Sequence, residues 1–475
     1  MTVLAIDQGT SGTKAIVVDP ENGVVGLAEV PVHPHYLVGG GVEHDPEELL
    51  GSVLAAGRTA VEQAGRPISA VSLANQGETV LAWDPKSGAP LTKAIVWQDR
   101  RSEELCNALA EHADTLAART GLVLDPYFSA PKMAWLRRNI EAGGVVTTSD
   151  TWLLHNLCGA FVTDATTASR SLAVELGGRD WDRELLALFE LDGERLPAIV
   201  ANDEIIGSTS AFGGDVPVGG IVVDQQAALL AEACLEPGMA KCTFGTGAFL
   251  LANSGAVPVH STAGLTSSLA WRVAGDDTFC IDGQVYTAAS AVKWLCSLGA
   301  ISGAEEMDSV AAPDNNGVLC VPALAGLAAP WWKSQATATI SGMTLSTGRG
   351  HLVLAVLQGI AAQIAELVTA INTDAAPLTR LRADGGLTRS QVLMQSCADI
   401  LQVPVDIYPS PHATGLGAAA LARLSLQPHL PLNAVIDDWA PSATYEPRWT
   451  DDRADEFRSQ WRALAATTYP AQETS

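Results

Sequence analysis

Residues 3–19 constrain the fold of this chain more than any other stretch. They form an apolar run, a short turn of glycine, threonine and serine, and a second apolar run, which predicts two strands joined as a hairpin. The turn gathers backbone N–H groups and hydroxyls between the carboxylate of Asp7 and the ammonium of Lys14. Phosphate oxygens can bind to the N–H groups and the ammonium, and a divalent cation can bind to the carboxylate. The stretch therefore indicates a candidate phosphate–metal site.

An ordinary hairpin with a glycine turn would give the same pattern without any ligand. The sequence does not match the P-loop, which has four residues between its first glycine and a Gly-Lys pair. In favour of the phosphate site, residues 240–255 repeat the arrangement of strand, Gly-Thr-Gly turn and strand. A second hairpin half a chain away indicates duplicated domains, whose two turns could hold a polyphosphate from both sides.

Composition argues against several classes of function. A chain of 475 residues has room for about two to three domains, and its content of 47% hydrophobic residues indicates a globular protein. The net charge of −25 argues against a nucleic acid or an anionic membrane as partner, because both bind basic surfaces. We find no apolar run long enough to span a bilayer and no basic leader, so we expect a cytoplasmic protein. The eight cysteines include no Cys-x-x-Cys pair, which predicts buried thiols rather than a zinc site.

Strands and helices alternate along the chain, which predicts an α/β fold. A helix is expected over 46–64, with Asp45 as its N-cap and a proline at its first position. Residues 163–170 are polar and rich in hydroxyls, and they are predicted to be a loop. Further helices are expected through residue 117, from Asp150 as a capped start, over 351–371 and over 452–466.

Two segments place polar groups where α/β proteins carry their chemistry. An apolar strand over 219–223 is followed by Asp224 and then a helix, so this carboxylate lies at the carboxyl end of a strand. Capping of that helix is the alternative role for Asp224. The Gly385-Gly386 pair would let the backbone approach a flat ring or a phosphate closely. Residues 415–417 are not interpreted as a dinucleotide fingerprint, because they lie in an alanine-rich helical run.

As a set, the motifs of this chain resemble the FGGY carbohydrate kinases of the actin/hexokinase-like ATPase superfamily, and most closely the glycerol kinases among them. The resemblance extends from Val3 to about Thr450, and two longer regions, 127–136 and 338–358, resemble the family's signature regions. The matching motifs lie at residues 7–14, 41–46, 75–79, 95–101, 125–135, 224–229, 244–249 and 383–386.

The resemblance implies an α/β fold of two ribonuclease-H-like (actin-like ATPase) domains with a catalytic cleft between them. Residues 1–230 would form the domain with the acceptor and phosphate–metal site, and residues 231–475 the nucleotide-binding domain. ATP would bind in the cleft together with Mg²⁺. The expected partner is a small polyol or sugar, with no nucleic acid and no membrane, and the chain is expected to form a homo-oligomer such as a dimer.

The resemblance also implies roles for individual residues. Asp224 would be the general base that accepts the proton of the attacking hydroxyl, and Asp7 would hold the metal. Core packing would otherwise be the expected role of Trp97, but an aromatic face against C–H groups suits a polyol site. ATP and its phosphates would be contacted by Thr10, Ser11, Lys14, Thr246, Ala289, Lys293, Gly386 and Ser390. The acceptor would be bound by Gly77, Glu78, Trp97, Tyr127, Gln225 and Phe249.

Some positions depart from the pattern of the glycerol kinases. Gly77 stands where they have an arginine, which removes a charged donor to a terminal hydroxyl and opens space. Sites that bind a hydroxyl discriminate by factors of up to about 10⁴–10⁵, so we expect a tetritol, a pentitol or a ketose as acceptor. Glycerol itself is the alternative. Ala289, Lys293 and Ser390 replace glycine, glutamine and asparagine, so the purine contacts are expected to differ.

Two further expectations concern regulation and the competing class of protein. Residues 213–217 correspond to a basic loop that binds fructose 1,6-bisphosphate in some bacterial glycerol kinases, and Asp215 in this loop predicts no such inhibition. A non-catalytic actin-fold sugar sensor is the competing interpretation of the fold. Such a protein would be expected to lose Asp7 or Asp224, and both are present.

Overall fold

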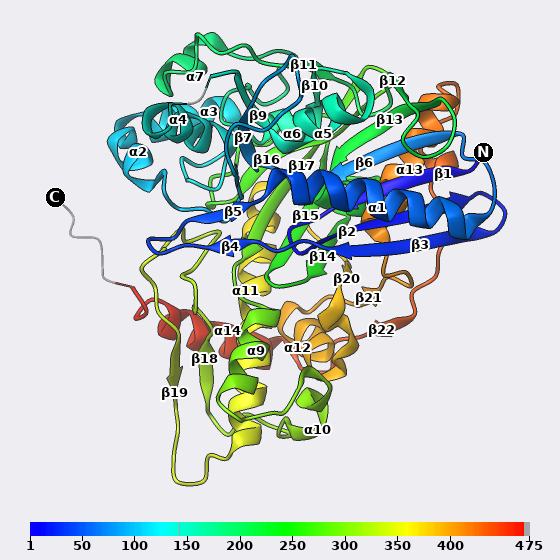
Figure 1. Cartoon of the computed structure of the whole chain (residues 1–475). Coiled ribbons are helices and arrows are strands. Elements are labelled where there is room, and N and C mark those ends of the chain that lie inside the picture. The colour runs from blue at the N-terminus through cyan, green and yellow to red at the C-terminus, as the bar shows by residue number, and fades with distance from the viewer. Residues whose placement is uncertain (142, 470–475) are drawn as a thin grey trace.

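The computed structural model describes residues 1–141 and 143–469 and contains two α/β domains, each with a central mixed sheet (Figure 1). In the N-terminal sheet β1, β6 and β13 are parallel neighbours, while β2 and β3 continue from β1 as an antiparallel meander. The strand order is β12 (Ile205–Thr209), β13 (Val216–Val223), β6 (Ala70–Asn75), β1 (Val3–Gln8), β2 (Gly12–Asp19) and β3 (Gly23–Pro31). The predicted hairpin is therefore confirmed as β1–β2, and Asp7 lies opposite Lys14 in it.

The C-terminal sheet repeats this arrangement. Its hairpin β14–β15 lies beside β20, which is parallel to β14 and to β21. The order is β16 (Thr266–Val273), β17 (Asp276–Val285), β15 (Ala248–Gly255), β14 (Ala240–Phe244), β20 (Leu381–Asp384), β21 (Val405–Ile407) and β22 (Ala443–Tyr445). The second hairpin thus occupies the same place in its sheet as the first, as the repeat in the sequence predicted.

Both faces of the N-terminal sheet are buried, which explains the continuous apolar runs of its strands. Leu4 and Ile6 of β1 pack toward α1 (Pro46–Ala64), whereas Val3 and Ala5 pack toward α13 (Ala413–Leu426). The prediction for α1 is confirmed, because the carboxylate of Asp45 accepts a hydrogen bond from Glu47 N. Residues 415–417 lie within α13, which confirms that they form no dinucleotide loop.

The core of the C-terminal domain surrounds α11 (Arg349–Asp374), the yellow helix of Figure 1. By length and composition α11 could cross a membrane, so the expectation that no apolar run is long enough was wrong. However, 83% of its most apolar 18-residue window is buried inside the protein, as in the core helix of a globular domain. The remaining helices of this domain are α9 (Ala289–Ser297), α10 (Met307–Val310), α12 (Gln391–Leu401) and α14 (Asp451–Ala465), whereas α8 (Asp224–Ala231) follows β13 of the N-terminal sheet directly.

A smaller sheet in the N-terminal domain supports the segments that carry the predicted acceptor residues. Its order is β4 (His35–Tyr36), β5 (Val42–His44), β8 (Ala94–Ile95), β7 (Val80–Trp83) and β9 (Val145–Thr148). The helices that follow are α2 (Glu103–Ala108), α3 (Ala113–Thr120), α4 (Ser129–Asn139), α5 (Ser149–Cys158), α6 (Ala165–Ser169) and α7 (Arg183–Leu188), and the short strands β10 (Val162–Asp164) and β11 (Ala198–Val200) pair beside them.

Three local predictions were wrong. The hydroxyl-rich segment 163–170 is not a loop, because the Asp164 carboxylate caps α6 by accepting from Thr166 N and Thr167 N. The helix through residue 117 is divided into α2 and α3 by a 3-10 turn over 110–112. Asp150 does not cap α5, since its carboxylate is buried and accepts from the Thr163 hydroxyl instead.

The β16 edge of the C-terminal sheet is covered by the N-terminal domain. Ser267 N of β16 donates to Gly121 O at 2.8 Å, and Leu269 N donates to Ser169 Oγ at 3.1 Å. Further along, Asn202 N donates to Arg272 O and Arg272 N donates to Asn202 Oδ1. These hydrogen bonds hold β16 against the end of α6, close to where the two domains enclose a cavity.

Candidate active site

A cavity of about 230 Å³ lies between the two domains. The parallel strands β1, β6 and β13 all end at this edge of the N-terminal sheet, so residues that follow them in the chain meet there. The cavity is lined by Thr10, Ser11, Tyr36, Gln76, Glu78, Trp97, Gln98, Tyr127, Arg170, Val223, Asp224 and Gln225, and from the other domain by Thr246, Phe249, Leu251, Asp282 and Gly283. Seven of the predicted site residues do not line the cavity, namely Asp7, Lys14, Gly77, Ala289, Lys293, Gly386 and Ser390.

Three aromatic side chains form one wall. The Trp97 ring meets Tyr127 and Phe249 edge-on, with ring centroids 5.6 Å and 5.8 Å away. The Trp97 indole Nε1 donates to Thr10 Oγ1 at 2.9 Å, and that hydroxyl donates to Gln76 Oε1 at 3.1 Å. Trp97 is half-buried and faces the cavity, so it is more than a packing residue of the core.

Asp224 is the first residue of α8, and Val223 is the N-cap. The capping role considered for Asp224 is therefore wrong; its Oδ1 accepts from the neighbouring Gln225 N at 2.6 Å. Burial raises the pKa of this carboxyl, and the nearby ammonium of Lys241 partly opposes that effect. A partly buried carboxylate with a raised pKa is suited to accept a proton.

Lys241 of β14 is a residue that the sequence did not single out. Its side chain is buried, and Nζ donates to Gln225 Oε1 at 2.5 Å and to Thr243 Oγ1 at 2.7 Å. Because the amide oxygen of Gln225 is taken up by this bond, its amide N–H donors face the Asp224 carboxylate and the cavity.

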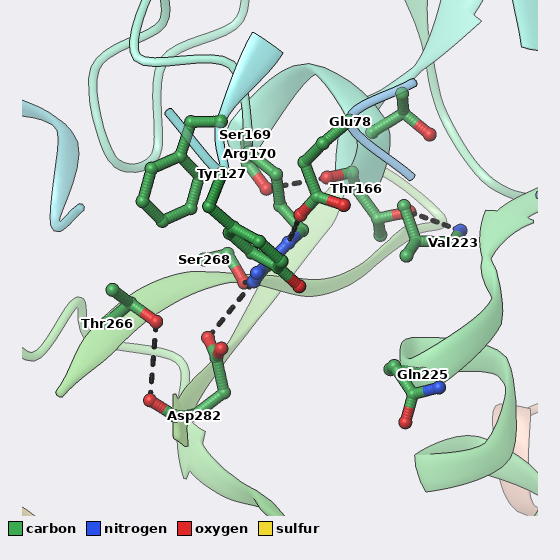
Figure 2. A network of polar contacts seen from close by, with 12 residues as sticks. Glu78, Tyr127, Thr166, Ser169, Arg170, Val223, Gln225, Thr266, Ser268 and Asp282 are labelled. Carbon is green, nitrogen blue, oxygen red and sulfur yellow. Dashed lines mark hydrogen bonds and ion pairs between the residues drawn. The ribbon is translucent and has the colours of Figure 1, made fainter. Parts of the chain in front are cut away.

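A second group that was missed is Arg170, at the end of α6 (Figure 2). Its guanidinium bonds to the Glu78 carboxylate and donates to Asp282 Oδ1 at 3.1 Å. Burial raises the pKa of Glu78, and Arg170 opposes this. The pKa of Tyr127 lies well above its usual range because the phenol is buried, so its hydroxyl stays protonated and can donate. The signal in the sequence was the polar segment that ends at Arg170.

The carboxylates near the first hairpin fit a divalent cation. Burial raises the pKa of Asp7 to about 7, with Asp224 and Asp384 adding to the effect and Lys14 opposing it. Oδ1 of Asp384 is buried with no hydrogen-bond partner in the described part of the chain. Within the part of the chain that the structure describes, no three or more His, Cys, Asp or Glu side chains form a group that could hold a metal ion alone. Mg²⁺ typically takes one or two carboxylates, with water and substrate phosphates as the other ligands, and this donor set fits that pattern.

The residues predicted to border adenosine lie in the C-terminal domain. A Cβ at Gly386 would meet no atom within 4 Å, whereas one at Gly385 would lie 2.5 Å from Phe244 O. Gly385 thus permits the close approach of two backbone segments, and open space is found at Gly386. The Ser390 hydroxyl is engaged within the protein, since it caps α12 and donates to Asp308 Oδ1 at 2.5 Å. Ala289 begins α9, and Lys293 is exposed on it.

Comparison with known proteins places this geometry in a family. The models of the FGGY family of carbohydrate kinases match residues 2–231 (N-terminal domain) and 240–426 (C-terminal domain). Glycerol kinase of Aromatoleum aromaticum is 42% identical over 481 residues, which covers 97% of each chain. Glycerol kinase of Bordetella parapertussis is 40% identical, over 97% of this chain and 96% of the relative.

A solved structure supports the same assignment. The crystal structure of Plasmodium falciparum glycerol kinase with ADP superposes with a TM-score of 0.90, at 32% sequence identity. It covers 99% of this chain and 98% of that chain. The two-domain α/β architecture is therefore shared along the full length.

Proposed function

This chain belongs to the FGGY family of carbohydrate kinases and is an ATP-dependent kinase resembling the glycerol kinases, and from that premise we propose that it phosphorylates a hydroxyl of a small neutral polyol or ketose. The observation that carries the proposal is the position of Asp224, which shares one cavity with the uncharged donors Tyr127 and Gln225 and the aromatic wall. ATP and metabolites of this kind meet in the cytoplasm, where we place the activity. The eight free cysteines accord with such a reducing compartment.

In the proposed reaction, the acceptor hydroxyl oxygen forms a bond to the γ-phosphorus of ATP. Its proton passes to the carboxylate of Asp224, and the bond from the γ-phosphorus to the β,γ-bridging oxygen breaks, which releases ADP. Thr10, Ser11 and Thr246 line the cavity from opposite domains and would contact the phosphates, together with Lys14. Asp7 would hold Mg²⁺, which supplies charge neutralisation on the phosphates.

The charges of the cavity favour a neutral acceptor. Among the described residues that line it, Arg170 is the only cation, and its guanidinium is paired with both Glu78 and Asp282. Asp224 adds a further carboxylate, so a sugar acid would meet more negative than positive charge. Polyol hydroxyls can instead accept from Tyr127 and Gln225 and donate to Glu78.

Gly77 bears on the length of the acceptor. It adopts a left-handed conformation with a φ of 62°, and a Cβ there would face Val223 at 3.3 Å. At the position where glycerol kinases have an arginine, this chain has no side chain. The position lies beside Val223, which lines the cavity. Loss of this donor supports a tetritol, a pentitol or a ketose as the best acceptor, while the similarity of about 40% to glycerol kinases supports glycerol as the alternative.

A panel of acceptors tests the proposal by ADP release with Mg²⁺–ATP. The panel contains glycerol, erythritol, xylitol, ribitol, xylulose, ribulose and gluconate. We expect the highest kcat/KM on a four- or five-carbon neutral compound and no turnover of gluconate. A clear preference for glycerol would contradict the longer acceptor and make the chain a glycerol kinase proper. Acceptor binding without ADP release from any compound would instead support the sugar sensor.

A further inference from the structure

Arg170 joins the two domains inside the acceptor cavity. On one side it bonds to Glu78, which lies in the turn after β6 of the N-terminal domain. On the other side it donates to Asp282 of β17 at 3.1 Å and to Ser268 Oγ of β16 at 3.4 Å (Figure 2). One guanidinium thus ties three elements that are about 90 to 110 positions away from it in the chain.

The surroundings of Arg170 strengthen this bridge. The residue is 5% exposed, and its guanidinium carbon lies 5.5 Å from the Tyr127 ring centroid and 5.7 Å from that of Phe128. Rings over the guanidinium keep water away and favour the cation. A buried cation of this kind is tolerated only where it is well paired, and here two carboxylates provide the pairing.

Glu78 is held in an unfavourable backbone conformation. Its φ of 47° lies in the left-handed region, which side-chain-bearing residues rarely adopt. Such a conformation persists only where surrounding contacts impose it, and the bond to Arg170 is the contact found for its carboxylate within the described residues. Because Nε of Arg170 takes Oε1 of Glu78, the second oxygen, Oε2, is left for a hydroxyl in the cavity.

We propose that Arg170 is a positioning residue for phosphoryl transfer, which orients Glu78 toward the acceptor by bridging it to Asp282 of the other domain. The inference rests on the proposed function, since it takes the acceptor to be the partner of Glu78. It adds that acceptor binding depends on the arrangement of the two domains. When β17 moves relative to β6, the bridge that aims the Glu78 carboxylate is lost.

Three variants and one matched control test this role. Arg170→Lys keeps the charge but cannot bridge both carboxylates with a planar fork, Arg170→Gln removes the charge, and Asp282→Asn removes the negative charge at one end of the bridge. Arg272→Lys is the control, because Arg272 is also buried and paired with an aspartate, Asp277, in the same β16–β17 hairpin but does not line the cavity.

Acceptor and ATP kinetics are measured for each variant at several pH values. For Arg170→Lys and Asp282→Asn we expect kcat/KM for the acceptor to fall by about 10- to 100-fold, the usual effect of removing an outer partner of a binding group. The KM for ATP should stay within a factor of about 3, since Arg170 does not touch the predicted phosphate residues. Arg272→Lys should behave as the wild type in both respects.

The pH profile separates orientation from mere stability. Arg170 and Lys132 favour the charged form of Glu78, whereas burial and Asp224 disfavour it. Without the Arg170 cation the pKa of Glu78 rises, so the acidic limb of kcat/KM moves to higher pH in Arg170→Gln and stays in place in Arg170→Lys. If Arg170→Gln does not fold, the other two variants decide the matter.

The outcomes distinguish this inference from the proposed function. Wild-type protein that turns over no acceptor removes the proposed function itself. Active wild type together with Arg170 variants that match Arg272→Lys, or with an unmoved acidic limb in a folded Arg170→Gln, would overturn the positioning role and leave the kinase activity intact.

Discussion

The indole of Trp97 donates a hydrogen bond to the hydroxyl of Thr10 across a distance of 2.9 Å. Trp97 belongs to the aromatic wall of the cavity, and Thr10 belongs to the turn between β1 and β2 that is predicted to contact phosphate. The same hydroxyl donates to Gln76, which precedes the Gly77-Glu78 turn. The acceptor wall and the phosphate turn are therefore positioned by one chain of hydrogen bonds.

Replacement of Trp97 by phenylalanine should weaken binding of both substrates. The ring wall is largely kept, but Thr10 loses its donor, and a single hydrogen bond of this kind corresponds to about a 3- to 10-fold effect. Initial-rate kinetics should show a rise of this size in the KM for ATP as well as for the acceptor. Trp181→Phe is the control, since its indole bonds to Pro197 O outside the cavity. An effect on the acceptor alone would contradict the link through Thr10.

Asp224→Asn should lower kcat by at least about 10²-fold, because the proton of the attacking hydroxyl loses its acceptor. The variant should not be less stable than the wild type. Burial raises the pKa of Asp224, which means that the folded protein disfavours the charged carboxylate, and asparagine carries no charge. Stopped-time ADP release and thermal unfolding together check both statements. Unchanged turnover would remove Asp224 from the role of base.

The stability of the ligand-free protein should depend on pH through Asp7. Its carboxyl has a pKa of about 7 when folded, whereas an unfolded chain gives about 3.9. Between about pH 4 and pH 7 the folded protein holds a proton that the unfolded chain has released, so this group's contribution to stability falls as the pH rises. Asp7→Asn removes that loss.

Thermal unfolding of wild type and Asp7→Asn between about pH 5 and pH 8 measures this effect. The Tm of Asp7→Asn relative to the wild type should increase with pH up to about 7 and then stay constant, because both folded and unfolded Asp7 are ionised above that pH. A difference in Tm that does not vary with pH would contradict the raised pKa.

Gly77→Arg should shift acceptor preference toward glycerol. The side chain restores a guanidinium beside Val223, at a backbone position where a φ of 62° costs a non-glycine residue about 1–2 kcal/mol. We expect the ratio of kcat/KM for glycerol to that for a pentitol to rise by about 10-fold or more. Gly65→Arg, with a φ of 61° and no atom within 4 Å of a Cβ, carries similar strain away from the cavity. An unchanged ratio would show that Gly77 does not select the acceptor.

Local patterns were sufficient to predict much of the framework. The alternation of apolar runs and a small-residue turn gave β1–β2, and Asp45-Pro46 marked the start of α1, because hairpins and caps depend on neighbouring residues. The segment 163–170 shows the limit of this reasoning. Its threonines were interpreted as loop residues, but Asp164 binds their N–H groups and hydroxyls and makes them a helix.

The candidate site shows a second limit, which is distance along the chain. Arg170 donates to Asp282, which is 112 positions away in the sequence. Ser390 donates to Asp308, which is 82 positions away. Pairings of this kind depend on how the fold places elements that are far apart in the chain, and no local spacing encodes that placement. The bond between Lys241 and Gln225 could not be predicted for the same reason. The two residues are only 16 positions apart, but they lie on different elements.

The covered edge of β16 has a consequence for the autonomy of the two domains. The amides of Ser267 and Leu269 find their acceptors on the other domain, at Gly121 O and Ser169 Oγ. A fragment cut at the boundary between the two family models would expose this strand with unpaired amides, which is a template for strand-to-strand association. We therefore expect that neither half of this chain is stable without the other. The C-terminal half expressed alone should aggregate rather than form a nucleotide-binding domain.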